Sequence, residues 1–187
     1  MAENTVEHGT VEEAPAEVRD GLVRAEEARR VLVAELAGLG VTMTAAMDAH
    51  PGFVPCGHAF AVVIDGLAGA ATATDAAELE ALAGAARARS EHVAAHRGVS
   101  QGDAAYVRTA MGKAAGVATM RAHLLAELMG IALAAQRGMA MGAMSDEVNV
   151  YLVNSLAALA AGEDTENVHE CLTRSSAAAA QAFSLVA

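Results

Sequence analysis

The sequence contains no tryptophan, and only 3% of its 187 residues are aromatic. A core must therefore be filled by leucine, valine, methionine and alanine, and helices that meet through alanine and glycine can approach each other closely. Threonine, isoleucine and aromatic residues, which favour strands, are few, whereas alanine, leucine, methionine and glutamate, which favour helices, are prominent. We therefore expect an all-α protein with almost no sheet.

Cysteine is scarce as well, since only Cys56 and Cys171 occur. They lie far apart in the sequence, and a reducing compartment would keep them as thiols. A chain of this length can bury a core as one domain without a disulfide or a metal ion. We therefore expect neither to be required for folding.

Blocks rich in lysine or arginine are also missing, and the formal net charge is −11. Such a chain lacks the positive surface that holds a phosphate backbone, so we exclude nucleic acid as the main partner. The N-terminus is acidic and has neither the basic nor the apolar region of a signal peptide, which favours a cytoplasmic location. The apolar stretches 59–73 and 114–135 are interrupted by charged or polar side chains, so no membrane span is expected.

Common catalytic motifs are absent too. We find no glycine-rich phosphate loop, no dinucleotide-binding fingerprint and no nucleophile elbow. These absences remove many frequent classes of enzyme and leave the reaction class open.

What is present is helical periodicity. Residues 1–14 lack it and are expected to form a disordered acidic tail, whereas residues 15–187 are expected to form a single helical-bundle domain. Apolar residues at alternating spacings of four and three, beginning with Val18 and Leu22, form a stripe that predicts a first helix from Pro15 to about Ala49 with this stripe facing the core. Further helices are predicted to open near Pro55, Asp75, Gln101, Ser145 and Asp164, with Gly98, Gly138 and Gly162 ending three of them.

The predicted fold is an antiparallel bundle of five to six helices. Its central member is a long helix at about 101–137, because that segment carries apolar residues on two sides. Short connections make successive helices antiparallel neighbours, so the helical rise of ~1.5 Å per residue assigns each polar residue a height in the bundle. These heights place the candidate functional residues in two polar layers, each a group of polar side chains at a similar height in the bundle.

The first layer lies at one end of the bundle, where the turn after His50 is expected to cover the end of the third helix. It combines thiol and imidazole groups, the ligand types that Zn, Cu or Fe would accept. Histidines near helix C-termini also stabilise exposed carbonyl groups, which is the alternative interpretation. The candidate metal ligands are Cys56, His58, His92 and His96.

The second layer lies near mid-height, roughly 25 Å from the first. Its arginines could hold an anionic substrate while an imidazole and a carboxylate exchange protons with it, as in an enzyme with an interhelical pocket. The candidate catalytic residues are His123, Glu127 and His169, and the candidate substrate-binding residues are Arg29, Arg121 and Glu166.

Two alternatives stand beside this small-molecule enzyme. Arg29 and Arg121 could instead pair with Glu127 and Glu166 as interior or interface ion pairs. The chain could also be a non-catalytic helical interaction protein, in which alanine-rich faces and the long first and fourth helices form a homodimer interface.

Overall fold

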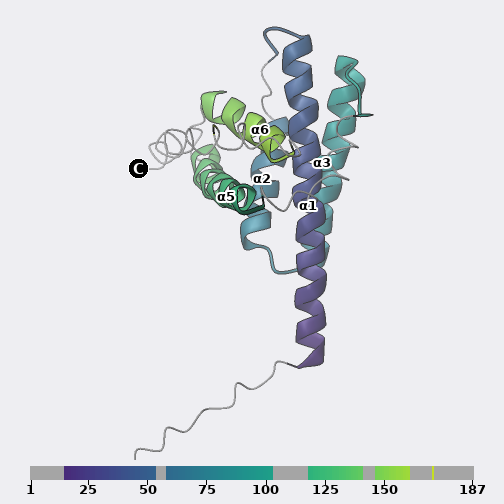
Figure 1. Ribbon diagram of the computed structural model, residues 1–187, viewed down its shortest axis with the longest axis vertical. Helices are drawn as coiled ribbons and strands as arrows, with labels where there is room; N and C mark the ends of the chain where they lie inside the picture. Colours follow the sequence, from purple (N-terminus) through teal and green to yellow (C-terminus); the bar gives the residue numbers. More distant parts are fainter. Residues whose placement is uncertain (1–14, 54–57, 103–117, 141–145, 161–169, 171–187) are drawn as a thin grey trace, which may run out of the picture.

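The computed structural model describes residues 15–53, 58–102, 118–140, 146–160 and 170, and its helices form a bundle (Figure 1). No strand occurs within these described ranges. The predicted all-α helical bundle is therefore confirmed. Its principal helices are α1 (Ala16–Ala49), α2 (His58–Thr72), α3 (Ala76–Arg97), α5 (Ala118–Ala140) and α6 (Asp146–Ala160).

The predicted ends of α3 are confirmed by its capping groups. The Asp75 side chain accepts a hydrogen bond from the Ala77 N–H at 3.3 Å, and so satisfies a donor that the helix itself leaves without a partner. Gly98 ends the helix in the left-handed conformation, with φ of 65°, which a residue without Cβ adopts at little cost.

The other predicted boundaries are met in part. The first helix ends at Ala49 as expected, whereas α5 continues past Gly138 to Ala140. Of the long fourth helix predicted at about 101–137, residues 118–137 are helical and residues 103–117 lie outside the described part. The acidic tail 1–14 and most of the predicted last helix also lie outside it.

Helices α1 and α3 pack side by side and run in the same direction. Polar contacts join Glu35 to Arg87 and Thr42 to Ser90, so position advances together along both helices. Helix α2 runs in the opposite direction to α1, because Arg29 contacts Ala73 just past the end of α2, whereas Leu36, later in α1, lies against Gly66, earlier in α2. Successive helices here are thus antiparallel as predicted, and that alternation makes α1 and α3 parallel.

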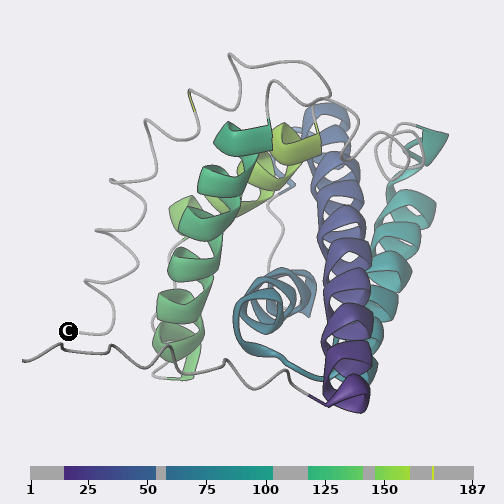
Figure 2. The same ribbon diagram turned by 60° about the horizontal axis from the view of Figure 1, so that its bottom comes forward.

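Among the described helices, α2 occupies the middle, a place that the sequence pattern predicted for the long helix at about 101–137. Figure 2 shows it nearly end-on, between the α1–α3 pair on one side and α5 and α6 on the other. Glycines permit close packing of α1 on α6 and of α2 on α1, because a Cβ added at Gly40 would lie 2.6 Å from Leu156 Cβ and one added at Gly66 would lie 2.7 Å from Leu36 Cδ2. The expected close approach of helices through small residues is therefore present.

The core is aliphatic, as the shortage of aromatic residues requires. Among the described residues, Phe60 is the one aromatic residue that is buried in the core. Leucines supply most of the large buried side chains. The largest fully buried side chains are Leu32, Leu36, Leu39, Met43, Ile64, Leu67, Leu79, Leu124, Leu128, Ile131, Leu152 and Leu156.

The N-terminal turns of α1 extend beyond this core. The apolar stripe predicted from Val18 onward is buried at Leu32 and beyond, but Val18 and Leu22 are exposed. The expectation that these two residues face the core is wrong, because α2 ends and α3 begins near the level of Arg29, leaving the first turns of α1 to project past both.

By length and composition alone, α1 is apolar enough to cross a membrane. In the bundle, 56% of its most apolar 18-residue window is buried among other helices. The core helix of a soluble protein passes the same test, so the composition of α1 is weak evidence for a span. The absence of a membrane partner and the cytoplasmic location stay predictions.

Candidate functional site

The turn that follows α1 lies against the C-terminal end of α3. His50 Nε2 is 2.8 Å from the Arg97 carbonyl oxygen, and because a carbonyl can only accept, the imidazole N–H donates this hydrogen bond. The Arg97 guanidinium carbon lies 4.3 Å from the centre of the Phe53 ring, a cation–π contact. The structure therefore brings His50 to the end of the bundle where the sequence placed it.

His92 and His96 lie on the exposed face of α3 at this same end. Their ring centroids are 3.9 Å apart and the rings are tilted by 34°. His96 Nδ1 also lies 2.9 Å from the His92 carbonyl oxygen. The two imidazoles predicted to share a face are thus in direct contact.

The other two candidate metal ligands are not placed. Cys56 lies outside the described residues, and for His58 the structure describes the helical backbone and not the side chain. Within the described ranges, no group of three or more histidine, cysteine, aspartate or glutamate side chains could hold a metal ion. The four-residue ligand set therefore stays a prediction.

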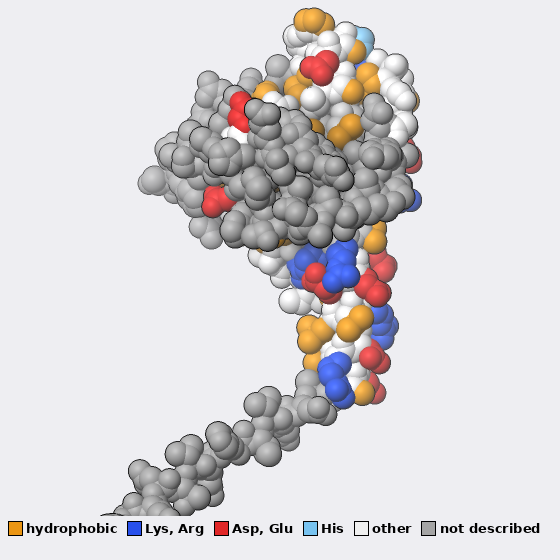
Figure 3. All heavy atoms as spheres, viewed as in Figure 1, with side chains coloured by type: hydrophobic (Ala, Val, Ile, Leu, Met, Phe, Trp, Pro, Cys, Tyr) orange, Lys and Arg blue, Asp and Glu red, His pale blue; other side chains and the backbone are white. Residues whose placement is uncertain are grey.

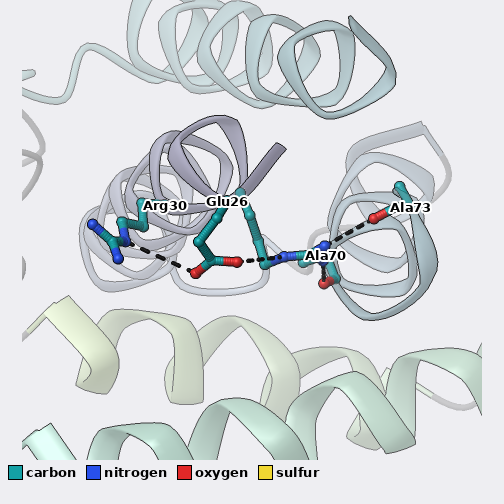
Figure 4. Close-up of polar contacts among 5 residues, drawn as sticks. Glu26, Arg30, Ala70 and Ala73 are labelled. Carbon is teal, nitrogen blue, oxygen red and sulfur yellow. Dashed lines mark hydrogen bonds and ion pairs between the residues drawn. The ribbon is translucent and has the colours of Figure 1, made fainter. Parts of the chain in front are cut away.

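Arg29 is the candidate substrate-binding residue whose contacts are clearest, and Figure 4 labels its partners Glu26, Ala70 and Ala73. Its guanidinium donates hydrogen bonds to the carbonyl oxygens of Ala70 and Ala73, the latter at 2.8 Å, and its Nε lies 3.3 Å from Glu26. Carbonyl groups at the end of a helix lack intrahelical partners and carry partial negative charge, which a guanidinium compensates. Arg29 therefore caps the C-terminus of α2.

This role predicts a measurable loss of stability. Replacing Arg29 with methionine should lower the free energy of unfolding by about 1–2 kcal/mol, because buried carbonyls lose a charged donor while the apolar stem is kept. Chemical denaturation measures this change. The matched control is Arg30→Met, since Arg30 is largely exposed and reaches Glu26 only at 3.8 Å, so its replacement should change stability by less than about 0.5 kcal/mol. Equal stabilities of the two variants would contradict the capping role.

The remaining residues of the second layer are only partly described. Glu127 is exposed on α5, and the side chains of Arg121 and His123 on the same helix are not described. Glu166 and His169 lie outside the described residues. The described part of the chain therefore does not test whether this layer forms a pocket, and the acid/base site stays a prediction.

Polar residues between α1 and α3 form a seam that sequence reasoning missed. Glu35 is 3% exposed and accepts hydrogen bonds from the Nε of Arg87, at 3.0 Å, and from its Nη2. Thr42 Oγ1 lies 2.8 Å from Ser90 Oγ, and both residues are buried. The sequence does show Glu35 as a single acidic residue within an apolar stretch of the first helix. It does not show which residue pairs with it.

The ion pair in this seam raises the pKa of Arg87. The hydrogen bond to Glu35 is the main cause, attraction to the same carboxylate and to Glu91 adds to it, and burial opposes it. A group whose folded-state pKa is raised contributes stability that is fully present below its unfolded pKa and is lost as the pH rises through its folded pKa. Because the pKa of arginine lies far above neutral pH, the guanidinium keeps its charge and its contribution throughout the neutral range.

Comparison with known proteins adds no identification: no family model, no curated protein and no solved structure matches this chain.

Proposed function

We propose that this chain is a helical interaction protein that self-associates through the N-terminal turns of α1. One observation carries the proposal: the large hydrophobic side chains that are exposed in the described part of the chain all lie on one helix segment. They are Val18, Leu22, Val23 and Val31, with 50%, 61%, 58% and 51% of their surface exposed. Val18 and Leu22 lie on one side of the helix and form the proposed surface with Val23 at its edge, whereas Val31 lies on the opposite side and is not part of it. Figure 3 shows hydrophobic and charged side chains together on the projecting part of this helix.

The exposed surface continues a face that is buried elsewhere. Val18, Leu22, Arg29 and Leu36 follow one another at helical spacings of four and seven, so they lie along one side of α1. At Leu36 and Arg29 that side meets α2. Beyond the end of α2 the same side is exposed at Val18 and Leu22, so a helix from another molecule could extend the packing.

A second copy of this segment, running antiparallel, fits the charges. If two copies pair about a point midway between Leu22 and Val23, Arg19 of each copy faces Glu26 of the other, and this contact occurs twice by symmetry. Parallel pairing would instead place Arg19 opposite Arg19. Glu26 already contacts Arg29 and Arg30, and Arg19 also has an interaction within its own chain, so these charges select orientation more than they add affinity.

The small area of the exposed surface on α1 determines how strong the proposed dimer is expected to be. A few half-exposed side chains bury far less than the ~800 Å² per partner of a standard interface. The dimer should therefore be weak and dependent on concentration. Such an association suits a protein that responds to local concentration, rather than an obligate dimer.

Sedimentation of the full chain across concentrations tests the proposal. The wild-type protein should shift from monomer to dimer between micromolar and about millimolar concentration, whereas Leu22→Glu should stay monomeric because it places a carboxylate at the centre of the contact. Ala85→Glu, an equal change of charge at an exposed position of α3, is the matched control and should dimerise as the wild type does.

Two results would overturn the proposal. One is a wild-type protein that remains monomeric at the highest concentration. The other is a Leu22→Glu variant that dimerises as the wild type does. If the full chain is monomeric and a chain beginning at Pro15 dimerises, the segment 1–14 occupies the face, and the proposed partner is wrong.

A further inference from the structure

The geometry at the C-terminal end of α3 points to a second, independent activity: we infer that His92 and His96 together bind a divalent transition-metal ion. Residues four apart on a helix are neighbours, and here the two imidazole rings already lie with their centroids 3.9 Å apart. Both side chains are exposed, so an ion can reach them without any opening of the bundle.

The hydrogen bond of His96 fixes which of its nitrogens is available. Its Nδ1 lies 2.9 Å from the His92 carbonyl oxygen, and a carbonyl oxygen can only accept. The proton of neutral His96 therefore sits on Nδ1, and Nε2 carries the lone pair. A histidine that binds a metal commonly donates its other ring N–H in this way, because the bond fixes the tautomer and orients the ring.

His50 provides a contrast at the same end of the bundle. Its Nε2 donates to the Arg97 carbonyl oxygen at 2.8 Å, so this nitrogen is used in joining the turn after α1 to α3. The site is therefore a two-imidazole chelate whose other coordination positions are left to water. Imidazole nitrogen favours nickel, copper and zinc over magnesium and calcium, which prefer oxygen ligands.

Titration with Ni²⁺ alone, followed by calorimetry at neutral pH, tests this inference. The wild-type chain should bind one ion at this site, and His96→Ala should weaken that binding. Removing a group that merely supports a metal ligand costs about 10–100-fold in affinity, so removing the ligand itself should cost at least about tenfold.

The matched control moves one histidine instead of deleting it. The double variant His92→Ala, Ala95→His keeps seven histidines and both cysteines, and Ala95 is exposed, so the fold should tolerate the change. Adjacent residues on a helix do not face each other, so this variant should lose affinity to a similar extent. Circular dichroism checks that both variants remain helical.

Two further readouts separate chelation from loose association. Ni²⁺ should raise the melting temperature of the wild-type chain more than that of the control, since it binds the folded helix. Acidification should weaken binding because protons compete with the metal for Nε2. Equal Ni²⁺ affinity in the wild type and the control, or no binding by the wild type, would overturn the inference.

Discussion

Replacing Gly40 with alanine should lower the free energy of unfolding by about 1–3 kcal/mol, although alanine is the better helix former. The added Cβ would lie 2.6 Å from Leu156 Cβ and 2.8 Å from the Ala157 backbone nitrogen. Neither atom belongs to the flexible end of a side chain, so α1 and α6 must move apart. That movement loosens a contact between two buried helix faces.

Gly84→Ala is the matched control, because the same substitution there meets open space. A Cβ added at Gly84, within α3, has no neighbour within 4 Å. Stability should rise by about 0.5–1 kcal/mol through the lower conformational entropy of the unfolded chain. Chemical denaturation of both variants measures the contrast. If Gly40→Ala stabilised the protein as Gly84→Ala does, the close packing of α1 on α6 would be wrong.

The second large effect concerns the seam between α1 and α3. Arg87→Ala should lower the free energy of unfolding by about 1–3 kcal/mol, because it removes the guanidinium that compensates the buried Glu35 carboxylate. The loss should fall below that of a fully buried pair, since 58% of the Arg87 side chain is exposed and water can partly replace it.

A double-mutant cycle isolates this pair. In a Glu35→Gln background the buried charge is gone, so Arg87→Ala should cost less than about 1 kcal/mol. Equal costs of Arg87→Ala in the two backgrounds would show that the ion pair does not couple α1 to α3.

The two proposed activities occupy opposite ends of the long helix pair. The self-association surface lies on the first turns of α1, and the histidine pair lies at the level of its last turn. A helix of 34 residues spans about 50 Å, so the two sites should act independently. Leu22→Glu should therefore leave Ni²⁺ affinity unchanged, and His96→Ala should leave self-association unchanged.

The sequence alone was a good guide to local structure. Capping groups such as Asp75 and Gly98 act within one turn of their own helix, so their effect on the ends of α3 could be predicted without knowing any neighbour. The contact between His92 and His96 was also predictable, because their spacing on one helix places them together. The course of the chain likewise placed His50 at that end.

Contacts between helices were less predictable. Arg29 was expected to need a carboxylate or an anionic ligand, but much of its charge is compensated by carbonyl groups where α2 ends. Every helix end offers such carbonyls, so the sequence gives no signal of which side chain will reach them. Glu35 shows the same difficulty, since its partner lies 52 positions away on a helix with several arginines.

The sequence by itself thus determined the helices, their order and the residues that share a face, because these depend on interactions within about one turn of the chain. Only the tertiary structure decided how far each helix extends past its neighbours. That relative length buries Leu32 and leaves Val18 and Leu22 exposed on the same stripe. Periodicity tells which residues lie together, whereas burial depends on a neighbour being present at that height.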